Sequence, residues 1–309
     1  MGRLLSAVRN RLRRIAGPAG AEAAAEGRGP VTVGGYLIQR EIGHGAFGAV
    51  YLGSDPETGK PAAIKTLDLS RHRDSASHGR IKERFLREAA MVALLAHPAI
   101  VVIYGAGEEG DLAYIAMEVI GGGSLDAWTK PGRLLPLPVL AGIMARVADA
   151  LDYAHRHRVV HRDVKPANIM VDLERDVVKI TDFGVATLLG EAVPDPCAFR
   201  GTPAYMAPEQ LGGPEVDGRA DLYSLGVTLF QLCTGRLPFF GDSVAELMYK
   251  IANEEAPAIT AADPALPARL AAIVGRCLAK DPRARYQSGA ELAEDLREWD
   301  REFNNKRQN

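Results

Sequence analysis

The 309-residue chain has few cysteines, no long apolar run and almost no net charge. Cys197, Cys233 and Cys277 are odd in number and widely spaced, without a C-x-x-C pair, which excludes a disulfide framework and a cysteine zinc site. A reducing compartment fits best, so we expect a cytoplasmic protein. The net charge of −2 provides no general basic field for nucleic acid.

The longest apolar run near the middle of the chain, residues 222–233, is interrupted by polar side chains. It is well short of the ~20 residues that cross a bilayer, and it predicts a buried core helix instead. The remaining composition, 47% hydrophobic and 25% charged, is typical of globular chains and excludes collagenous and disordered classes. The length suits one large domain or two lobes.

Residues 1–16 form a basic amphipathic segment, with leucine, valine and isoleucine on one helical face and arginines around the rest. The arginines interrupt the apolar core that a signal peptide requires. Three alternatives stay open for this segment: a solvated tail, weak docking on an anionic membrane or a partner, and myristoylation at Gly2. Residues 17–35, rich in Ala, Gly, Glu and Pro, predict a flexible linker, residues 36–299 the folded domain, and 300–309 a tail.

The folded domain begins with strands and continues with helices. Runs rich in β-forming residues, separated by glycine-rich or turn-like segments, lie at 36–42, 49–53, 62–67, 100–104 and 112–119. Helical composition follows at 137–157, 220–234, 243–253, 267–279 and 288–303. This order predicts an α+β fold, with a small antiparallel sheet lobe at 36–119 and a larger helical lobe at 121–299.

One predicted helix carries a carboxylate on its apolar face. The residues at helical spacing on that face are Ile81, Phe85, Glu88, Val92 and Leu95. A buried carboxylate is costly without a cation. Lys65, within the apolar strand 62–67, is the natural partner for Glu88.

Gly43, Gly45 and Gly48 form a G-x-G-x-x-G motif between two predicted strands. Glycines at a hairpin tip let backbone N–H groups approach phosphate oxygens, because no Cβ intervenes. A Rossmann site is disfavoured, since such a site needs a strand before the motif and a helix after it. When the motif is taken alone, an ordinary glycine-rich hairpin is the favoured interpretation. A Lys65 held beside it by Glu88 would add a cation for nucleotide phosphates.

The octet at 161–168, HRDVKPAN, concentrates chemically useful side chains. Asp163 is a candidate base, Lys165 a candidate phosphate-neutralising cation and Asn168 a candidate metal ligand. Asp182 adds a second carboxylate at the end of a predicted strand. Phosphoryl transfer needs a positioned hydroxyl, neutralised oxygens and magnesium held by oxygen ligands, and these residues supply those roles.

Six motifs follow one another along the chain: GHGAFGAV, AAIK, the helix glutamate, HRDVKPAN, DFG and GTPAYMAPE. Together they resemble the motifs of protein kinases, specifically the bacterial serine/threonine type. The resemblance covers residues 36–299 and implies a bilobal kinase fold with ATP bound in its cleft. It implies that Asp163 orients and deprotonates the substrate hydroxyl and that Lys165 stabilises the γ-phosphate. Asn168 and Asp182 would bind Mg²⁺, with Mn²⁺ as an alternative.

The same resemblance assigns the nucleotide site. Lys65, held by Glu88, would grip the α- and β-phosphates. Met117 would be the gatekeeper, with the backbone of Glu118 and Ile120 facing adenine. The full implied set is Ile42, Gly43, Gly45, Phe47, Gly48, Val50, Ala63, Lys65, Met117, Glu118, Ile120, Asn168, Met170 and Asp182.

The same resemblance implies which type of substrate hydroxyl is phosphorylated, and it implies three structural roles. Lys165 together with Thr202 is similar to the serine/threonine pattern and unlike the tyrosine-specific one. Glu209 and Arg285 would form a buried ion pair. Asp221 would hold the backbone of the catalytic loop, and His161 would pack as a structural residue.

The segment between Gly184 and Gly201 departs from the family. The position where a phosphorylatable residue is common is Ala198, and Thr187 is the sole hydroxyl in 185–200. Arg162 would therefore need another anion, supplied by Asp195 or Glu191, or an order imposed by a partner or a homodimer.

These observations predict an ATP- and magnesium-dependent serine/threonine protein kinase that acts on protein substrates, with autophosphorylation. A pseudokinase scaffold that binds nucleotide without turnover is the rival from another class. A small-molecule phosphotransferase is disfavoured, because GTPAYMAPE resembles a peptide-binding segment.

Overall fold

The computed structural model describes residues 31–44, 48–69, 75–183, 203–212 and 216–308. The chain divides into two compact units, unit 1 with Met1–Leu94 and Val101–Val119, and unit 2 with Leu95–Ile100 and Ile120–Asn309. The division after Val119 falls at the lobe boundary expected from sequence. Residues 95–100 belong to unit 2, because Ile180 N–H donates to the Ala99 carbonyl at 2.8 Å.

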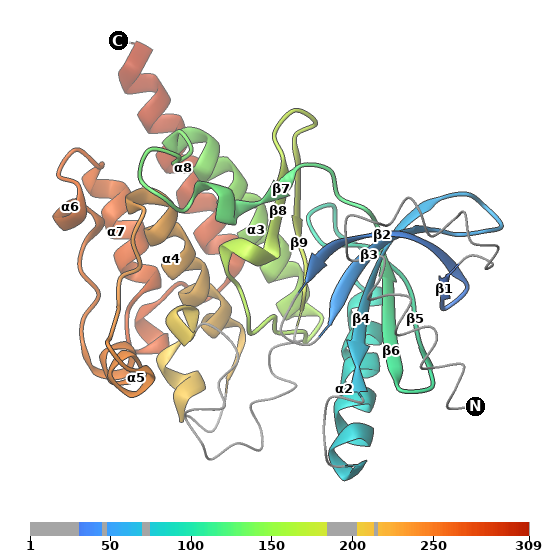
Figure 1. Cartoon of the computed structure of the whole chain (residues 1–309). Coiled ribbons are helices and arrows are strands. Elements are labelled where there is room, and N and C mark those ends of the chain that lie inside the picture. The colour runs from blue at the N-terminus through green and yellow to red at the C-terminus, as the bar shows by residue number, and fades with distance from the viewer. Residues whose placement is uncertain (1–30, 45–47, 70–74, 184–202, 213–215, 309) are drawn as a thin grey trace. The chain divides into compact units, whose positions relative to one another are not determined.

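Unit 1 is an antiparallel sheet with a helix packed on it (Figure 1). The strand order is β1-β2-β3-β4-β6-β5. Its elements are β1 (Thr32–Val33), β2 (Tyr36–His44), β3 (Ala49–Ser54), β4 (Pro61–Asp68), α2 (Ser75–Ala93), β5 (Ile103–Glu109) and β6 (Leu112–Met117). Helix α2 packs against β5 and β6. The expected small sheet lobe is confirmed.

The first strand corrects the predicted linker at residues 17–35. Thr32 and Val33 of β1 pair with Leu37 and Tyr36 of β2. Val31 and Val33 are buried, and both belong to the core cluster of unit 1. The ordered sheet therefore begins before Tyr36, since two valines contribute enough apolar surface to add a short edge strand.

Two further boundaries in unit 1 differ from the sequence expectation. Helix α2 ends at Ala93, so Leu95 lies beyond it, although Phe85 and Val92 are buried on the helix as predicted. Strand β5 begins at Ile103, later than the predicted start at residue 100. The reason is that Ile100 forms a parallel bridge with Ile180 of unit 2.

Unit 2 combines a small sheet with the larger set of helices. The sheet has the order β7-β8-β9. The elements of the unit are β7 (Gly123–Ser124), η3 (Leu125–Trp128), α3 (Leu137–Arg156), η4 (Pro166–Asn168), β8 (Ile169–Asp172), β9 (Val177–Ile180), η7 (Pro203–Tyr205), η8 (Pro208–Leu211), α4 (Gly218–Thr234), α5 (Val244–Asn253), α6 (Ile259–Ala262), α7 (Ala268–Cys277), η9 (Pro282–Ala284) and α8 (Gly289–Gln308). The predicted α+β class is confirmed.

Helix α4 is the buried centre of unit 2. The Asp217 side chain caps its first turn by accepting the Arg219 N–H at 2.9 Å. Gly235 ends the helix in the left-handed region, with φ of 72°. Most of its side chains are buried, which confirms the core helix predicted over 222–233. Within the described residues, no helix has the length and apolarity to cross a bilayer.

Helix α8 is longer than predicted. It continues past Trp299 to Gln308, through most of the segment expected to be a tail at 300–309. Arg269 of α7 donates to Glu298 and Glu302, each at 2.6 Å, and Phe303 stacks on Trp299 at 5.0 Å between ring centroids. These contacts support the extra turns, which are too polar to be predicted from an apolar stripe.

Candidate active site

The catalytic octet forms one hydrogen-bonded group in unit 2. The Asp163 carboxylate accepts bonds at Oδ2 from Lys165 Nζ at 2.7 Å and from Asn168 Nδ2 at 2.9 Å. Asn168 Nδ2 also donates to the Asp163 carbonyl at 2.8 Å. Within the described part of the chain, Oδ1 of Asp163 has no hydrogen-bond partner, so one oxygen of the predicted base is held and the other is left to receive a proton.

Asn168 and Asp182 come to the same end of a hairpin. Ile169 of β8 pairs with Ile180 of β9, and Thr181 N–H donates to the Asn168 carbonyl at 2.9 Å. The pairing therefore brings the start of β8 beside the end of β9, next to Asp182. Because the Asn168 amide nitrogen is used by Asp163, its oxygen is the atom left for a cation.

These two side chains suit magnesium. An amide oxygen and a carboxylate are the hard ligands that Mg²⁺ prefers, and Mg²⁺ is usually completed by substrate phosphates and water. Among the residues that the structure describes, no cluster of three or more His, Cys, Asp and Glu could hold a metal by itself. The donor set therefore fits a metal that arrives with a nucleotide.

Helix α4 fixes the backbone that precedes Asp163. The Asp221 carboxylate is fully buried and accepts the N–H of Arg162 at 2.7 Å and of His161 at 2.8 Å. These bonds hold Arg162 at a φ of 64°, in the left-handed region that non-glycine residues rarely adopt. The predicted role of Asp221 in holding the loop backbone is borne out by this geometry.

His161 is a structural residue in this arrangement. Its Nδ1 accepts the Asp163 N–H at 3.2 Å, and its Nε2 lies 2.9 Å from the Thr181 carbonyl. These two partners fix the Nε2–H tautomer, since a backbone N–H can only donate and a carbonyl can only accept. The ring also packs on Phe183 at 4.5 Å between centroids.

Sequence reasoning missed His155, which lies on α3. Its Nε2 is 2.7 Å from Asp221 Oδ2, so the same carboxylate oxygen serves His155 and the His161 N–H. The residue stands six positions before His161 in the sequence. No pattern of spacing identifies it, because its partner is far along the chain on another helix.

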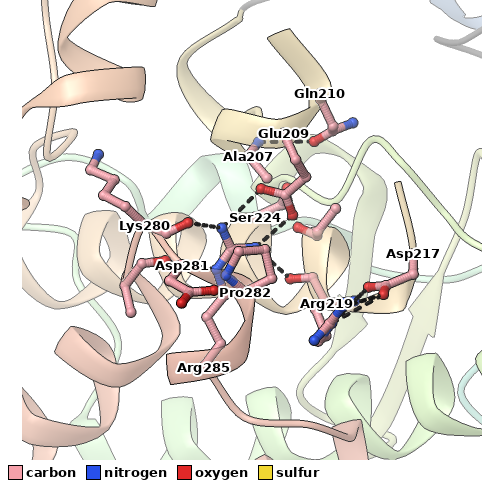
Figure 2. Close-up of polar contacts among 12 residues, drawn as sticks. Ala207, Glu209, Gln210, Asp217, Arg219, Ser224, Lys280, Asp281, Pro282 and Arg285 are labelled. Carbon is pink, nitrogen blue, oxygen red and sulfur yellow. Dashed lines mark hydrogen bonds and ion pairs between the residues drawn. The ribbon is translucent and has the colours of Figure 1, made fainter. Parts of the chain in front are cut away.

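The predicted ion pair between Glu209 and Arg285 is present (Figure 2). Arg285 Nη1 and Nη2 donate to the two oxygens of Glu209 at 2.6 and 2.9 Å. The guanidinium also donates to the carbonyls of Ala279, Arg219 and Lys280. A charge with this many partners is stabilised in spite of its complete burial.

In unit 1, strand register gathers several predicted nucleotide residues on one sheet face. Val50 lies opposite Lys65, and Ala63 lies opposite Met117. Lys65 and Ala63 are two residues apart, so these four side chains share a face. Glu88 Oε1 accepts a bond from Arg84 Nε, one turn earlier on α2, at 3.2 Å. The Lys65–Glu88 pair stays a prediction.

Gly48 is required for steric reasons that the motif alone does not reveal. A Cβ on this residue would lie 1.8 Å from the Thr66 carbonyl oxygen, on the neighbouring strand β4. Gly43 has more room, since its nearest neighbour would be the Val50 Cβ at 3.8 Å. Gly45, Phe47 and Thr202 lie outside the described residues, as do Thr187, Glu191, Asp195 and Ala198.

The predicted hinge residue Glu118 is bound twice to the segment before β5. Its N–H donates to the Val102 carbonyl at 2.9 Å, and its Oε1 accepts the Val102 N–H at 2.8 Å. Ile120 and Met170, also predicted at adenine, belong to unit 2, and Met170 lies on β8. Ile42, on β2, is 42% exposed.

Comparison with known proteins identifies relatives of this chain. Residues 36–296 match the protein kinase domain. The probable serine/threonine-protein kinase SCO3848 of Streptomyces coelicolor is 39% identical over 279 residues, covering 86% of this chain and 40% of that protein. The serine/threonine-protein kinase PrkC of Bacillus subtilis is 37% identical over 266 residues, covering 85% of this chain and 40% of that protein. The chain thus spans well under half the length of these relatives.

Solved structures agree with the sequence relatives. The crystal structure of the Mycobacterium tuberculosis PknI kinase domain has a TM-score of 0.70 and 32% identity, covering 88% of this chain and 98% of that one. The fold, the motif order and the geometry around Asp163 lead to the same assignment. The chain belongs to the protein kinase family, and its resemblance to the bacterial serine/threonine kinases is confirmed.

Proposed function

We propose that this chain transfers the γ-phosphate of ATP to serine and threonine hydroxyls of proteins, with Asp163 as the catalytic base. The observation that carries the proposal is the state of the Asp163 carboxylate. Lys165 and Asn168 bind one of its oxygens, and within the described residues no group binds the other. A carboxylate held in this way can accept a proton from a hydroxyl in a fixed direction.

The hydroxyl proton passes to Asp163 as the hydroxyl oxygen forms a bond to the γ-phosphorus, while the bond from that phosphorus to the β–γ bridging oxygen breaks and ADP leaves. Lys165, whose ammonium lies 2.7 Å from Asp163 Oδ2, neutralises charge on the transferred group. Thr202 belongs to the same proposed serine/threonine pattern.

Asn168 and Asp182 would hold Mg²⁺, or Mn²⁺ in its place. When bound, the cation supplies neutralisation of the phosphate oxygens. In unit 1, Lys65 would bind the α- and β-phosphates with support from Glu88, and the glycine-rich turn would cover them. The sheet face shared by Val50, Ala63 and Met117 would receive adenine.

Location, regulation and assembly are proposals that extend this function. We propose a cytoplasmic protein whose residues 1–16 are a solvated tail or else dock weakly on a membrane or a partner. Liposome sedimentation with and without residues 1–20 separates these alternatives. Equal partitioning of both forms would exclude the membrane helix. For regulation, we propose that Asp195 or Glu191, or else a partner or homodimer contact, replaces loop phosphorylation. Stoichiometric phosphate within 185–200 that activity requires would refute that replacement.

The activity is tested with γ-labelled ATP, Mg²⁺ and a protein acceptor, comparing the wild type with Lys65→Met. We expect label in phosphoserine and phosphothreonine, lost in the variant. Nucleotide binding without transfer by the wild type would indicate the pseudokinase alternative. Label found only in small molecules would indicate the other phosphotransferase class.

A further inference from the structure

Gln210, the residue after Glu209, connects two segments that the proposed function uses separately. It lies in η8 (Pro208–Leu211), directly after GTPAYMAPE, the segment that resembles a peptide-binding segment. Its Oε1 accepts the Ala207 N–H at 2.9 Å, as Figure 2 shows. Its Nε2 donates to the Arg162 carbonyl at 3.2 Å. One side-chain amide therefore bridges this segment and the catalytic loop.

The carbonyl that Gln210 binds belongs to the peptide unit immediately before Asp163. The N–H of the same peptide unit donates to His161 Nδ1 at 3.2 Å. On the other side of Arg162, its own N–H is held by Asp221 at 2.7 Å. The plane of the 162–163 peptide is thus fixed at its oxygen by Gln210 and at its nitrogen by His161.

This peptide plane needs such support. Arg162 has a φ of 64°, which is disfavoured for a residue with a side chain. The orientation of the 162–163 peptide sets ψ of Arg162 and φ of Asp163, so a change in that orientation would also turn the Asp163 side chain. Loss of the bond at the carbonyl oxygen therefore loosens the aim of the carboxylate.

Gln210 itself is well anchored. Its N–H donates to the Ala207 carbonyl at 3.0 Å, and the adjacent Glu209 is bound by two nitrogens of Arg285. The amide therefore reaches the catalytic loop from a rigid base. Movement of the Ala207 segment would be transmitted to the Arg162 carbonyl through one side chain.

We propose that Gln210 is a positioning residue that aims Asp163 by holding the 162–163 peptide, and so couples the substrate-binding segment to the catalytic loop. The inference rests on the proposed role of Asp163. Gln210 acts through Arg162 and does not touch the reacting atoms.

Two variants of Gln210 separate its donor from its acceptor. Gln210→Glu keeps an oxygen for the Ala207 N–H but loses the donor to Arg162, whereas Gln210→Met loses both. We expect kcat per nucleotide-binding molecule to fall about tenfold in each variant at pH 8, with KM for ATP within twofold. The Glu variant also turns a second acceptor toward the Arg162 carbonyl, so its loss of kcat should be at least as large as that of the Met variant.

Gln287→Glu is the matched control. Gln287 is exposed, and its Nε2 donates to the carbonyls of Pro282, Arg283 and Arg285, away from the catalytic loop. We expect its kcat to stay within twofold of wild type. Normalising rates to bound nucleotide removes any contribution from unfolded protein.

The proposal is overturned if kcat of both Gln210 variants stays within twofold of wild type, or if the loss is the same in Gln287→Glu. Hydrogen exchange of a peptide spanning 159–166 separates this failure from failure of the Asp163 role. Faster exchange in Gln210→Met supports the holding of the 162–163 peptide by Gln210 even if Asp163→Asn retains activity, and unchanged exchange overturns it.

Discussion

The catalytic loop and the Glu209–Arg285 pair are both groups of hydrogen-bonded charges in unit 2, but they differ in access to solvent. The Asp163 and Lys165 side chains are 22% and 24% exposed, whereas Arg285 is fully buried and Glu209 is 14% exposed. In the first pair, no described residue binds Oδ1 of Asp163. In the second, Arg285 donates to one carboxylate and several carbonyls. Charges that must react stay accessible, and charges that hold the fold are enclosed.

The largest expected effect is on rate. Asp163→Asn replaces the base by a group that cannot accept the hydroxyl proton, so we expect phosphotransfer to fall by ~10²–10⁴-fold. The melting temperature should change little, because the side chain is partly exposed and an amide can still bind Lys165 through its oxygen. A rate loss explained by lower thermal stability would contradict the assigned role.

The next effect is on stability. Arg285→Met leaves the Glu209 carboxylate without its principal cation, so the free energy of unfolding should fall by about 3–5 kcal/mol. Urea denaturation measures it. Arg301→Met is the control, because the Arg301–Glu294 pair is exposed and is expected to contribute below about 1 kcal/mol. Equal losses in the two variants would remove the contrast between enclosed and exposed pairs.

Asp221 should affect both quantities, since it is enclosed and yet holds the catalytic loop. In Asp221→Asn, an amide N–H faces a backbone N–H, so one donor loses its acceptor at a cost of about 1–3 kcal/mol. We expect a roughly tenfold lower kcat as Arg162 and Asp163 shift. Asp217→Asn, at the cap of the same helix, should leave kcat unchanged and cost below about 1 kcal/mol, because asparagine caps as well as aspartate and the Asp217–Arg219 pair that it weakens is partly exposed.

In unit 1 the comparison can be made between two glycines. Gly48→Ala places a Cβ 1.8 Å from the Thr66 carbonyl oxygen, so strands β3 and β4 must separate locally. We expect a loss of about 1–3 kcal/mol in unfolding free energy. Gly43→Ala meets only ordinary contacts and should be nearly neutral in stability. The reverse order of stabilities would show that the register described here is wrong.

The smallest effect concerns Lys280. Its Nζ donates to the Ile251 carbonyl at 2.6 Å over the Phe239 ring, and burial, opposed by Glu255, lowers its pKa to about 8. At pH values between about 8 and the ordinary pKa of lysine, Lys280 is protonated in the unfolded chain and neutral in the folded chain. Stability therefore rises with pH across this window.

Urea denaturation at pH 7.5 and 9.5 measures this rise as a difference between the wild type and Lys280→Met. Wild type should gain stability over the variant at the higher pH. Lys130→Met, at an exposed position, should show no such change. A wild-type advantage that shrinks as pH rises would contradict the lowered pKa.

The sequence was informative wherever chemistry restricts the residue type. The roles of Asp221 and of the Glu209–Arg285 pair were predicted from motif resemblance, and the structure contains the contacts. The short strand at Thr32–Val33 was missed, because two residues give no readable alternation. The end of α8 was missed because polar contacts from Arg269 support it.

Other contacts had no local signal at all. His155 meets Asp221 across 66 residues, and Gln210 meets Arg162 across 48. Such pairs are created by tertiary packing, so neither periodicity nor composition near one partner indicates the other. The motif resemblance identified the residues expected to react, and the structure was needed to identify those that hold them.

The most direct test measures the single-turnover phosphotransfer rate per nucleotide-bound molecule for Asp163→Asn and Arg285→Met side by side. The account predicts a fall of at least about 100-fold for Asp163→Asn, and a rate within about threefold of wild type for Arg285→Met at a temperature where it is folded. Near-wild-type transfer by Asp163→Asn would contradict the assignment of Asp163 as the base and, with it, the proposed function of this site.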